Sequence, residues 1–220
     1  MKEQTRDLTP PYFRYVVRLI RPFPDFDFSF IKPVRQRAVE MLNLKQGDRV
    51  LDMGCGPGGC FPYLVHSVGA SGEVVGVEIS PEVAINARRR IEKNGWRNVQ
   101  VIEADARTVH LTGTFDGALM FAAADVYASE EALENIFPHL RNKARVVLFG
   151  VKTSSNPLGK ILNPFFRMAI SKLNFPTTPW QLDSEPWRMV AKRVEKLDVQ
   201  EYFFGSMFVA SGTAVTKKRQ

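Results

Sequence analysis

Short apolar runs alternate with longer stretches of helical periodicity between residues 47 and 151. The apolar runs have the length of buried strands and end near glycine, proline or acidic residues. In order, they are RVLDMG, GEVVGVEIS, NVQVIEAD, FDGALMF and ARVVLFGV. Strand–helix alternation at this spacing predicts an α/β fold, in which helices cover both faces of a doubly wound, mostly parallel sheet.

Two of the intervening helices have recognisable ends. Ser80 and Pro81 predict an N-cap and a first helical residue, and Gly95 predicts the C-terminal stop of the same helix. Ser129 predicts the N-cap of a second helix over EEALENIFPHL, whose first-turn glutamates favour the positive end of the helix dipole. A further helix is expected near Cys60–Val68, directly after a glycine-rich turn.

Near the C-terminus the pattern changes from parallel strands to a hairpin. The stretch VQEYFFGSMFVASG predicts two antiparallel strands with a tight turn at Gly205-Ser206. A chain of 220 residues is expected to form one domain with small additions. Its expected parts are an N-terminal helical and aromatic cap over 1–45, an α/β core over 46–151, a helical lid over 152–196, the hairpin over 197–212, and a basic tail over 213–220.

The composition is that of a soluble globular protein, with 45% hydrophobic and 24% charged residues. We expect a cytoplasmic location, because the sequence has neither a membrane-length apolar run nor a signal-peptide core. The two cysteines, Cys55 and Cys60, are expected to be reduced. No metal site is expected, because His66, His110 and His139 are scattered along the chain.

The net charge of +7 is concentrated toward the two ends of the chain, whereas the centre is mildly acidic. Such basic ends are either solvated surface or contacts with an anionic partner, which could be a membrane surface, an acidic substrate or nucleic acid.

The glycine-rich turn after the first strand, VLDMGCGPGG, satisfies the dinucleotide pattern G-x-G-x-x-G. However, Asp52 stands at the end of that strand, where its carboxylate would repel a pyrophosphate and attract an amine. Glu78 ends the second strand, where a carboxylate can accept hydrogen bonds from two ribose hydroxyls. Asp105 follows the third strand and adds another carboxylate at the same sheet edge. A P-loop is excluded, since no Gly-Lys-Ser/Thr follows the turn.

In this order and spacing, VLDMGCGPGG, VVGVEIS, VIEADAR and FDGALMF resemble the four motifs of the class I S-adenosylmethionine-dependent methyltransferases. The resemblance covers residues 45–151 closely and extends through the hairpin to about residue 211. It implies a Rossmann-like sheet, S-adenosyl-L-methionine as cofactor and S-adenosyl-L-homocysteine as product. It also implies cofactor contacts from Asp52, Gly54, Cys55 and Gly56 near the methionine portion, Glu78 and Ile79 at the ribose and adenine, Asp105 and Ala106 at the adenine edge, and Phe121 near the methionine end.

The methyl sulfonium is already activated, so such an enzyme mainly has to align a nucleophile and exclude water. After the fourth strand the chain reads MFAAADVY, and not the Asn/Asp-Pro-Pro-Tyr/Phe of enzymes that methylate nucleobase or amide nitrogens. Asp125 and Tyr127 are the candidates for orienting a nucleophile there. Asp125 could instead cap the following helix.

The expected acceptor is a small hydrophobic or amphiphilic molecule, similar to a lipid, a quinone or a phenol. PPYFRYVVRLIRPFPDFDFSFIKP and NPLGKILNPFFRMAISKLNFP have the composition of basic interfacial helices, which would allow peripheral contact with an anionic membrane. The alternative is that both segments only pack on the core.

Three other functions compete with this interpretation. The pI of about 9.5 would suit an RNA methyltransferase, but the basic residues are interleaved with aliphatic ones, which disfavours a nucleic-acid partner. The chain could also bind S-adenosylmethionine without methyl transfer. A nicotinamide-dependent oxidoreductase is the third alternative.

Overall fold

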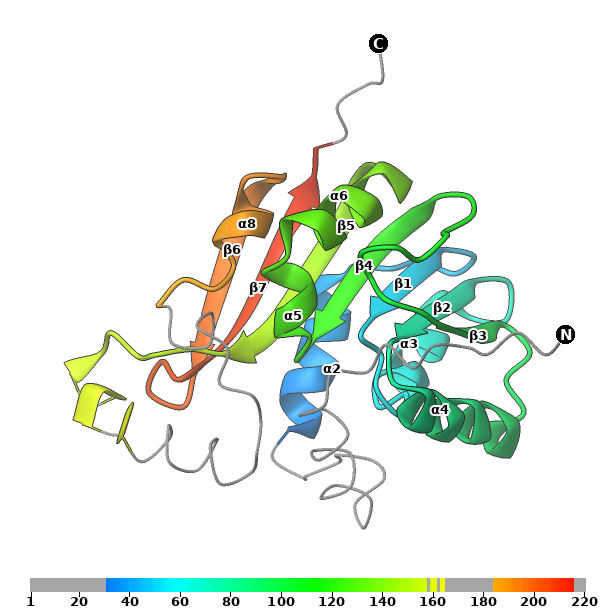
Figure 1. Ribbon diagram of the computed structural model, residues 1–220, viewed down its shortest axis with the longest axis horizontal. Helices are drawn as coiled ribbons and strands as arrows, with labels where there is room; N and C mark the ends of the chain where they lie inside the picture. The colour runs from blue at the N-terminus through cyan, green and yellow to red at the C-terminus, as the bar shows by residue number, and fades with distance from the viewer. Residues whose placement is uncertain (1–30, 158, 162, 165–183, 216–220) are drawn as a thin grey trace, which may run out of the picture.

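The computed structural model describes residues 31–157, 159–161, 163–164 and 184–215. Seven strands form one sheet in the order β3-β2-β1-β4-β5-β7-β6 (Figure 1). Their bounds are β1 Arg49–Met53, β2 Glu73–Glu78, β3 Val99–Glu103, β4 Phe115–Phe121, β5 Leu140–Val151, β6 Val194–Tyr202 and β7 Met207–Ala214. Strands β1 to β5 are parallel, and β7 pairs antiparallel with both β5 and β6. The predicted α/β fold with a C-terminal antiparallel hairpin is therefore confirmed.

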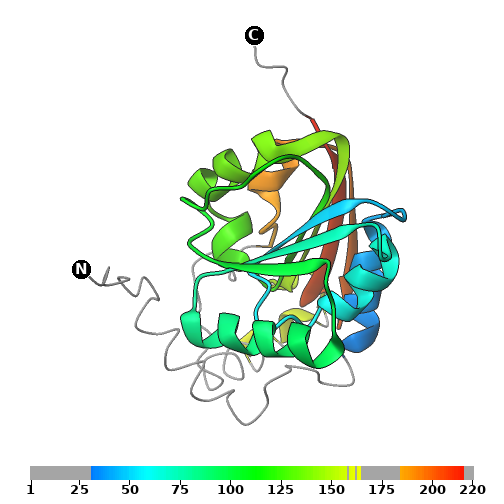
Figure 2. The same cartoon turned by 90° about the vertical axis from the view of Figure 1, so that its right-hand side faces the viewer.

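Helices cover both faces of this sheet. One face packs against α2 Lys32–Met41, α3 Phe61–Val68 and α4 Pro81–Asn94, and the other against α5 Ala124–Tyr127, α6 Glu130–Ile136 and α8 Arg188–Ala191. Figure 2 shows α2 and α3 on the opposite side of the sheet from α5, α6 and α8. Because neighbouring side chains of a strand point to opposite faces, Val50 enters the core under α2 and Leu51 enters the core under α6.

The predicted helix ends are mostly confirmed. Helix α4 begins at Pro81 and is followed by Gly95 in the left-handed conformation, with φ of 66°. The Ser129 side chain accepts a hydrogen bond from Ala132 N at 3.2 Å and caps α6. The Ser80 side chain makes no capping hydrogen bond, and the Ser80 backbone N–H donates to Glu78.

The predicted hairpin is present, and its loop contains Gly205 and Ser206 but is longer than the tight turn that we expected. Tyr202 pairs with Met207, so the loop comprises residues 203–206. Phe203 and Phe204 have φ of 49° and 57°, a region that is unfavourable for residues with a Cβ. The Ser154 hydroxyl donates to the Phe204 carbonyl at 2.6 Å and so helps to hold this strained turn in place.

The segments expected to flank the core are only partly described. Helix α2 belongs to the predicted cap over 1–45, yet Val34, Ala38 and Val39 bury it directly against the sheet. Residues 1–30, residues 165–183 of the predicted lid, and residues 216–220 of the basic tail lie outside the described part. Within that part, no helix is long and apolar enough to cross a membrane.

Candidate functional site

Asp52 is the most unusual charged side chain at the carboxyl edge of the sheet. It lies near the end of β1, is 1% exposed, and neither carboxylate oxygen accepts a hydrogen bond from the protein. Burial raises the pKa of Asp52 to about 7, partly countered by the positive charge of Arg35 and increased by the negative charge of Glu78. Buried polar groups are normally hydrogen-bonded, so this carboxylate is suited to a ligand that brings a donor or a positive charge.

Arg35 is the cation that stands near Asp52, and the sequence analysis did not identify it. Helix α2 buries its side chain, whose guanidinium carbon lies 5.1 Å from the centre of the Phe121 ring. A Cβ at Gly59 would come within 3.0 Å of the same guanidinium. Arg35 shares its helix face with Val34 and Ala38, and this charge within an apolar face is the signal that could have revealed it.

The glycine-rich turn brings its backbone close to these charges. Gly54 has φ of 68°, and a Cβ there would lie 2.7 Å from the Ala123 Cβ, so the turn packs tightly on the loop after β4. A Cβ at Gly56, in contrast, would have no atom within 4 Å. The backbone at Gly56 therefore borders open space.

Glu78 lies at the end of β2 and faces the same turn. Its carboxylate accepts hydrogen bonds from Gly56 N at 3.0 Å and from Ser80 N at 2.8 Å. Burial raises the pKa of Glu78 to about 7, although both backbone hydrogen bonds act in the opposite direction. Each oxygen retains a further lone pair, so the oriented carboxylate can still accept bonds from two ribose hydroxyls.

Asp105 already has a partner in the free protein. Arg107 donates to its carboxylate from the backbone at 2.9 Å and from Nε at 3.0 Å. The hydrogen bonds from the Arg107 side chain lower the pKa of Asp105. The neighbouring Ala106 carbonyl accepts a hydrogen bond from Asn135 of α6 at 3.1 Å. An adenine contact by Asp105 or Ala106 therefore remains a prediction. For such a contact, adenine would have to compete with Arg107 for the Asp105 carboxylate.

The two candidates after β4 face different surroundings. Asp125 lies within α5, so it does not cap α6 as the alternative interpretation allowed. Burial raises the pKa of Asp125, and its charge raises the pKa of Glu78. The charges of Asp105 and Arg107 also act on the pKa of Asp125. Tyr127 is buried against Phe208, and a Cβ at Gly150 would collide with its hydroxyl. Burial also raises the pKa of Tyr127, so it remains a neutral phenol.

The remaining predicted contacts lie around the same strands. Cys55 is a buried free thiol, as is Cys60, and the Cys55 amide donates to Val77 O at 3.0 Å. Ile79 is half-buried directly after Glu78. The Phe121 ring stacks on Phe149 with ring centres 4.3 Å apart. In the described part of the chain, no group of three or more His, Cys, Asp and Glu side chains could hold a metal ion.

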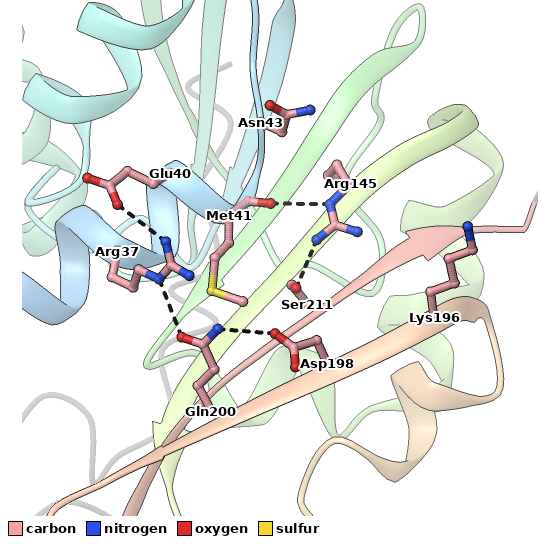
Figure 3. Close-up of a pocket in the computed structure, with 9 residues that line it drawn as sticks. All are labelled: Arg37, Glu40, Met41, Asn43, Arg145, Lys196, Asp198, Gln200 and Ser211. Atoms are coloured by element: carbon pink, nitrogen blue, oxygen red, sulfur yellow. Dashed lines mark hydrogen bonds and ion pairs between the residues drawn. The ribbon is translucent and has the colours of Figure 1, made fainter.

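A separate hollow of about 470 Å³ lies on the α2 side of the sheet, where α2 meets β5, β6 and β7. Figure 3 shows that the polar side chains that line it bond mostly to one another. Arg37 donates to Gln200 at 3.3 Å, and Arg145 donates to Ser211 at 2.9 Å. None of the predicted cofactor residues lines this hollow. The predicted cofactor residues Asp52 and Glu78 lie at the carboxyl edge of the sheet, away from this hollow.

Comparison with known proteins gives a domain family and a fold. Residues 50–143 match the family described as "Methyltransferase domain". Aklanonic acid methyltransferase DauC of Streptomyces sp. (strain C5) is 37% identical over 80 residues, which are 36% of this chain and 36% of that protein. 23S rRNA (uracil(1939)-C(5))-methyltransferase RlmD of Acinetobacter baumannii (strain AB0057) is 48% identical over 59 residues, which are 27% of this chain and 13% of that protein. Each match thus covers about a third or less of the relative.

Among solved structures, a SAM-dependent methyltransferase from Aquifex aeolicus is similar over 92% of this chain and 98% of its own, with a TM-score of 0.62 and 19% identity. At this identity the likeness concerns the fold. The unpartnered Asp52 carboxylate, the nearby Arg35 guanidinium and the oriented Glu78 carboxylate fit an amino acid group and a ribose at the same edge. Residues 50–143 of the chain thus match a methyltransferase domain, and the fold over most of the chain is similar to that of a SAM-dependent methyltransferase.

Proposed function

We propose that the protein transfers a methyl group from S-adenosylmethionine to a small hydrophobic or amphiphilic acceptor. The observation that carries the proposal is the buried Asp52 carboxylate, which lacks a hydrogen-bond partner although Arg35 lies nearby. An α-amino acid group has an ammonium for Asp52 and a carboxylate for Arg35, and both pairs would be charge-assisted. When bound, the cofactor supplies a methyl carbon that its sulfonium has already activated.

The residues of the chain then have to bind the reactants, orient them and exclude water. Glu78 orients the ribose, and Gly54 and Gly56 let the backbone come close to the ligand. Ala122 has φ of 60°, and its amide donates to Phe149 O at 2.9 Å, which fixes the loop that leads into α5. This arrangement positions reactants without a dedicated base, which suits an acceptor that is already nucleophilic.

Apolar surface near the β6–β7 turn supports a hydrophobic acceptor and peripheral contact with an anionic membrane. Phe203 is 44% and Phe204 is 56% exposed at the tip of the hairpin. A Cβ at Gly159 would collide with the Phe204 carbonyl, so the helical stretch that contains the exposed Ile161 begins beside this turn. Aromatic side chains at a protein tip insert readily into the interfacial region of a bilayer.

Two alternatives to this function, methylation of RNA and cofactor binding without methyl transfer, are outcomes of the experiment described below. One relative is named as an rRNA methyltransferase and another as an aklanonic acid methyltransferase, so the shared domain alone does not select the acceptor. Binding of the cofactor without transfer is the second alternative.

The first experiment is thermal unfolding with S-adenosylhomocysteine, with NAD and without ligand. A ligand at about 100 times its Kd should stabilise the fold by about 2.7 kcal/mol. Stabilisation by NAD alone would contradict the proposed cofactor. Protein that binds S-adenosylhomocysteine is then incubated with methyl-labelled S-adenosylmethionine and with phenols, quinols, phospholipid vesicles or total RNA. Label in the small molecules supports the proposal, whereas label in RNA or in no acceptor supports one of the alternatives.

A further inference from the structure

Lys152 is a buried cation that the proposed mechanism does not use. It directly follows β5, and its side chain is 1% exposed. Its ammonium lies 2.8 Å from Glu201 Oε1 and 5.7 Å from the centre of the Trp187 ring. A buried ammonium is unfavourable unless it is paired, so this position requires an anion. In the free protein that anion is Glu201, whose side chain is 43% exposed and can turn toward water.

A second buried polar group lies opposite Lys152. The Lys152 amide donates to Ser206 O at 2.9 Å, which continues the β5–β7 ladder beyond the pair of Val151 and Met207. Opposite residues of an antiparallel pair direct their side chains to the same face of the sheet. Ser206 is 2% exposed, and its hydroxyl has no hydrogen-bond partner in the protein. A hydroxyl without a partner beside a buried ammonium is suited to a ligand oxygen.

Aromatic rings connect these polar groups with the loop after β4. The Trp187 and Phe208 rings meet edge to face with centres 4.9 Å apart, and Phe208 meets Tyr127 in the same way at 6.2 Å. Tyr127 belongs to α5, which follows the Ala123 that packs against Gly54. Trp187 is only half-buried and is therefore the ring that a ligand can reach most directly.

We infer that Lys152, Ser206 and Trp187 form an acceptor subsite for a small aromatic molecule that carries a carboxylate. The carboxylate takes the place of Glu201 at the Lys152 ammonium and accepts a hydrogen bond from Ser206, while the aromatic part lies against Trp187. A neutral acceptor would leave the buried ammonium without a counter-charge once Glu201 is displaced. This inference rests on the proposed methyl transfer, since it names the acceptor class of that reaction.

The test compares two probes of the same shape, naphthalene-2-carboxylate and naphthalene-2-carboxamide. Their binding to the full chain is measured by calorimetry, with and without saturating S-adenosylhomocysteine. We expect the carboxylate to bind at least about tenfold more tightly than the amide, as for a charge-assisted contact. Equal binding of the two probes, or failure of the carboxylate to bind, would overturn the subsite.

Three variants locate the effect. Lys152→Met should remove the preference for the carboxylate, and Ser206→Ala should reduce it. Glu201→Gln should increase carboxylate affinity, because it removes the competing anion. Lys196→Met is the matched control, since Lys196 is an exposed lysine beside the other hollow and should leave the preference unchanged. A preference that survives Lys152→Met would also overturn the subsite.

The cofactor titration in the same preparations separates this inference from the proposed function. If the unmodified protein did not bind S-adenosylhomocysteine, the proposed function would be contradicted. Normal cofactor binding together with equal affinity for the two probes would contradict only the acceptor subsite.

Discussion

The Arg35 guanidinium lies close enough to Asp52 to counter part of the rise in the pKa that burial causes, yet neither Asp52 oxygen accepts a hydrogen bond from it. A guanidinium and a carboxylate that meet without a third group usually form two parallel hydrogen bonds. Helix α2 and strand β1 instead hold the two charges apart. An amino acid group between them would pair its ammonium with Asp52 and its carboxylate with Arg35. Substitution of either side chain should therefore weaken binding of that ligand by itself.

Arg35→Met should weaken binding of S-adenosylhomocysteine by about 2 kcal/mol, or about thirty-fold, because it removes the partner of the ligand carboxylate. It should leave the affinity for 5′-methylthioadenosine unchanged, since that ligand has no amino acid group. Calorimetric titration of both ligands measures the difference. Arg37→Met, in the same helix but facing the other hollow, is the control. An equal loss for both ligands would mean that Arg35 supports the site only through packing.

Glu78→Ala should weaken both ligands, because both contain the ribose. Removing two hydrogen bonds to a charged acceptor should weaken each ligand by about 2–3 kcal/mol. The control is Glu82→Ala, which removes an exposed carboxylate in the first turn of α4. If Glu78→Ala retained the affinity for both ligands, the ribose assignment would be wrong.

Asp52→Asn should stabilise the ligand-free protein at alkaline pH. Burial raises the pKa of Asp52 in the folded state from 3.8 to about 7, so folding favours the protonated carboxyl. The free energy of unfolding should therefore fall as the pH rises from about 4 to above 7, and Glu78 adds a change of the same sign. Asparagine removes the Asp52 contribution, and we expect a gain of about 1–3 kcal/mol at pH 8.

Urea unfolding at pH 5, 6, 7 and 8 without ligand measures this gain. The exposed Asp198→Asn is the control and should leave the pH dependence unchanged. A gain for Asp52→Asn that is equal at pH 5 and pH 8 would contradict the assigned titration.

Cofactor affinity should show the opposite pH dependence. The ligand ammonium stabilises the ionised form of Asp52, and ribose hydroxyls stabilise that of Glu78, so binding should release protons near neutral pH. The affinity for S-adenosylhomocysteine should therefore rise between pH 5.5 and pH 8. Calorimetry in buffers of different ionisation enthalpy counts the released protons. Proton uptake on binding would exclude this role for the two carboxylates.

The sheet and the positions of Asp52 and Glu78 could be predicted because they depend on local pattern. Strands β1, β2 and β4 are short and mostly apolar, and the end of a parallel strand places its carboxylate at one edge. Arg35 could not be assigned, since its role arises only when α2 packs beside β1. Asp105 was predicted to face a ligand, although Arg107, two residues later, is its partner in the free protein. The turn at Gly205-Ser206 was predicted, but its extension to Phe203 and Phe204 was not, because it depends on the pairing of Tyr202 with Met207 and on the hydrogen bond from Ser154.

That turn gives a prediction in which stability and membrane contact change in opposite directions. The double substitution Phe203→Asn and Phe204→Gly introduces residues that favour positive φ, so the free energy of unfolding should rise by about 1–2 kcal/mol. The same change removes the exposed aromatic tip, so co-sedimentation with vesicles rich in anionic phospholipid should decrease.

Ile85→Ser is the control for this experiment, because it removes an exposed apolar side chain from α4, far along the sheet from the hairpin. It should leave vesicle binding unchanged. Urea unfolding of the double variant confirms that any loss of vesicle binding occurs in a folded and more stable protein. If the double variant were more stable but sedimented with vesicles as the unmodified protein does, the strained Phe203–Phe204 turn would not be a membrane contact.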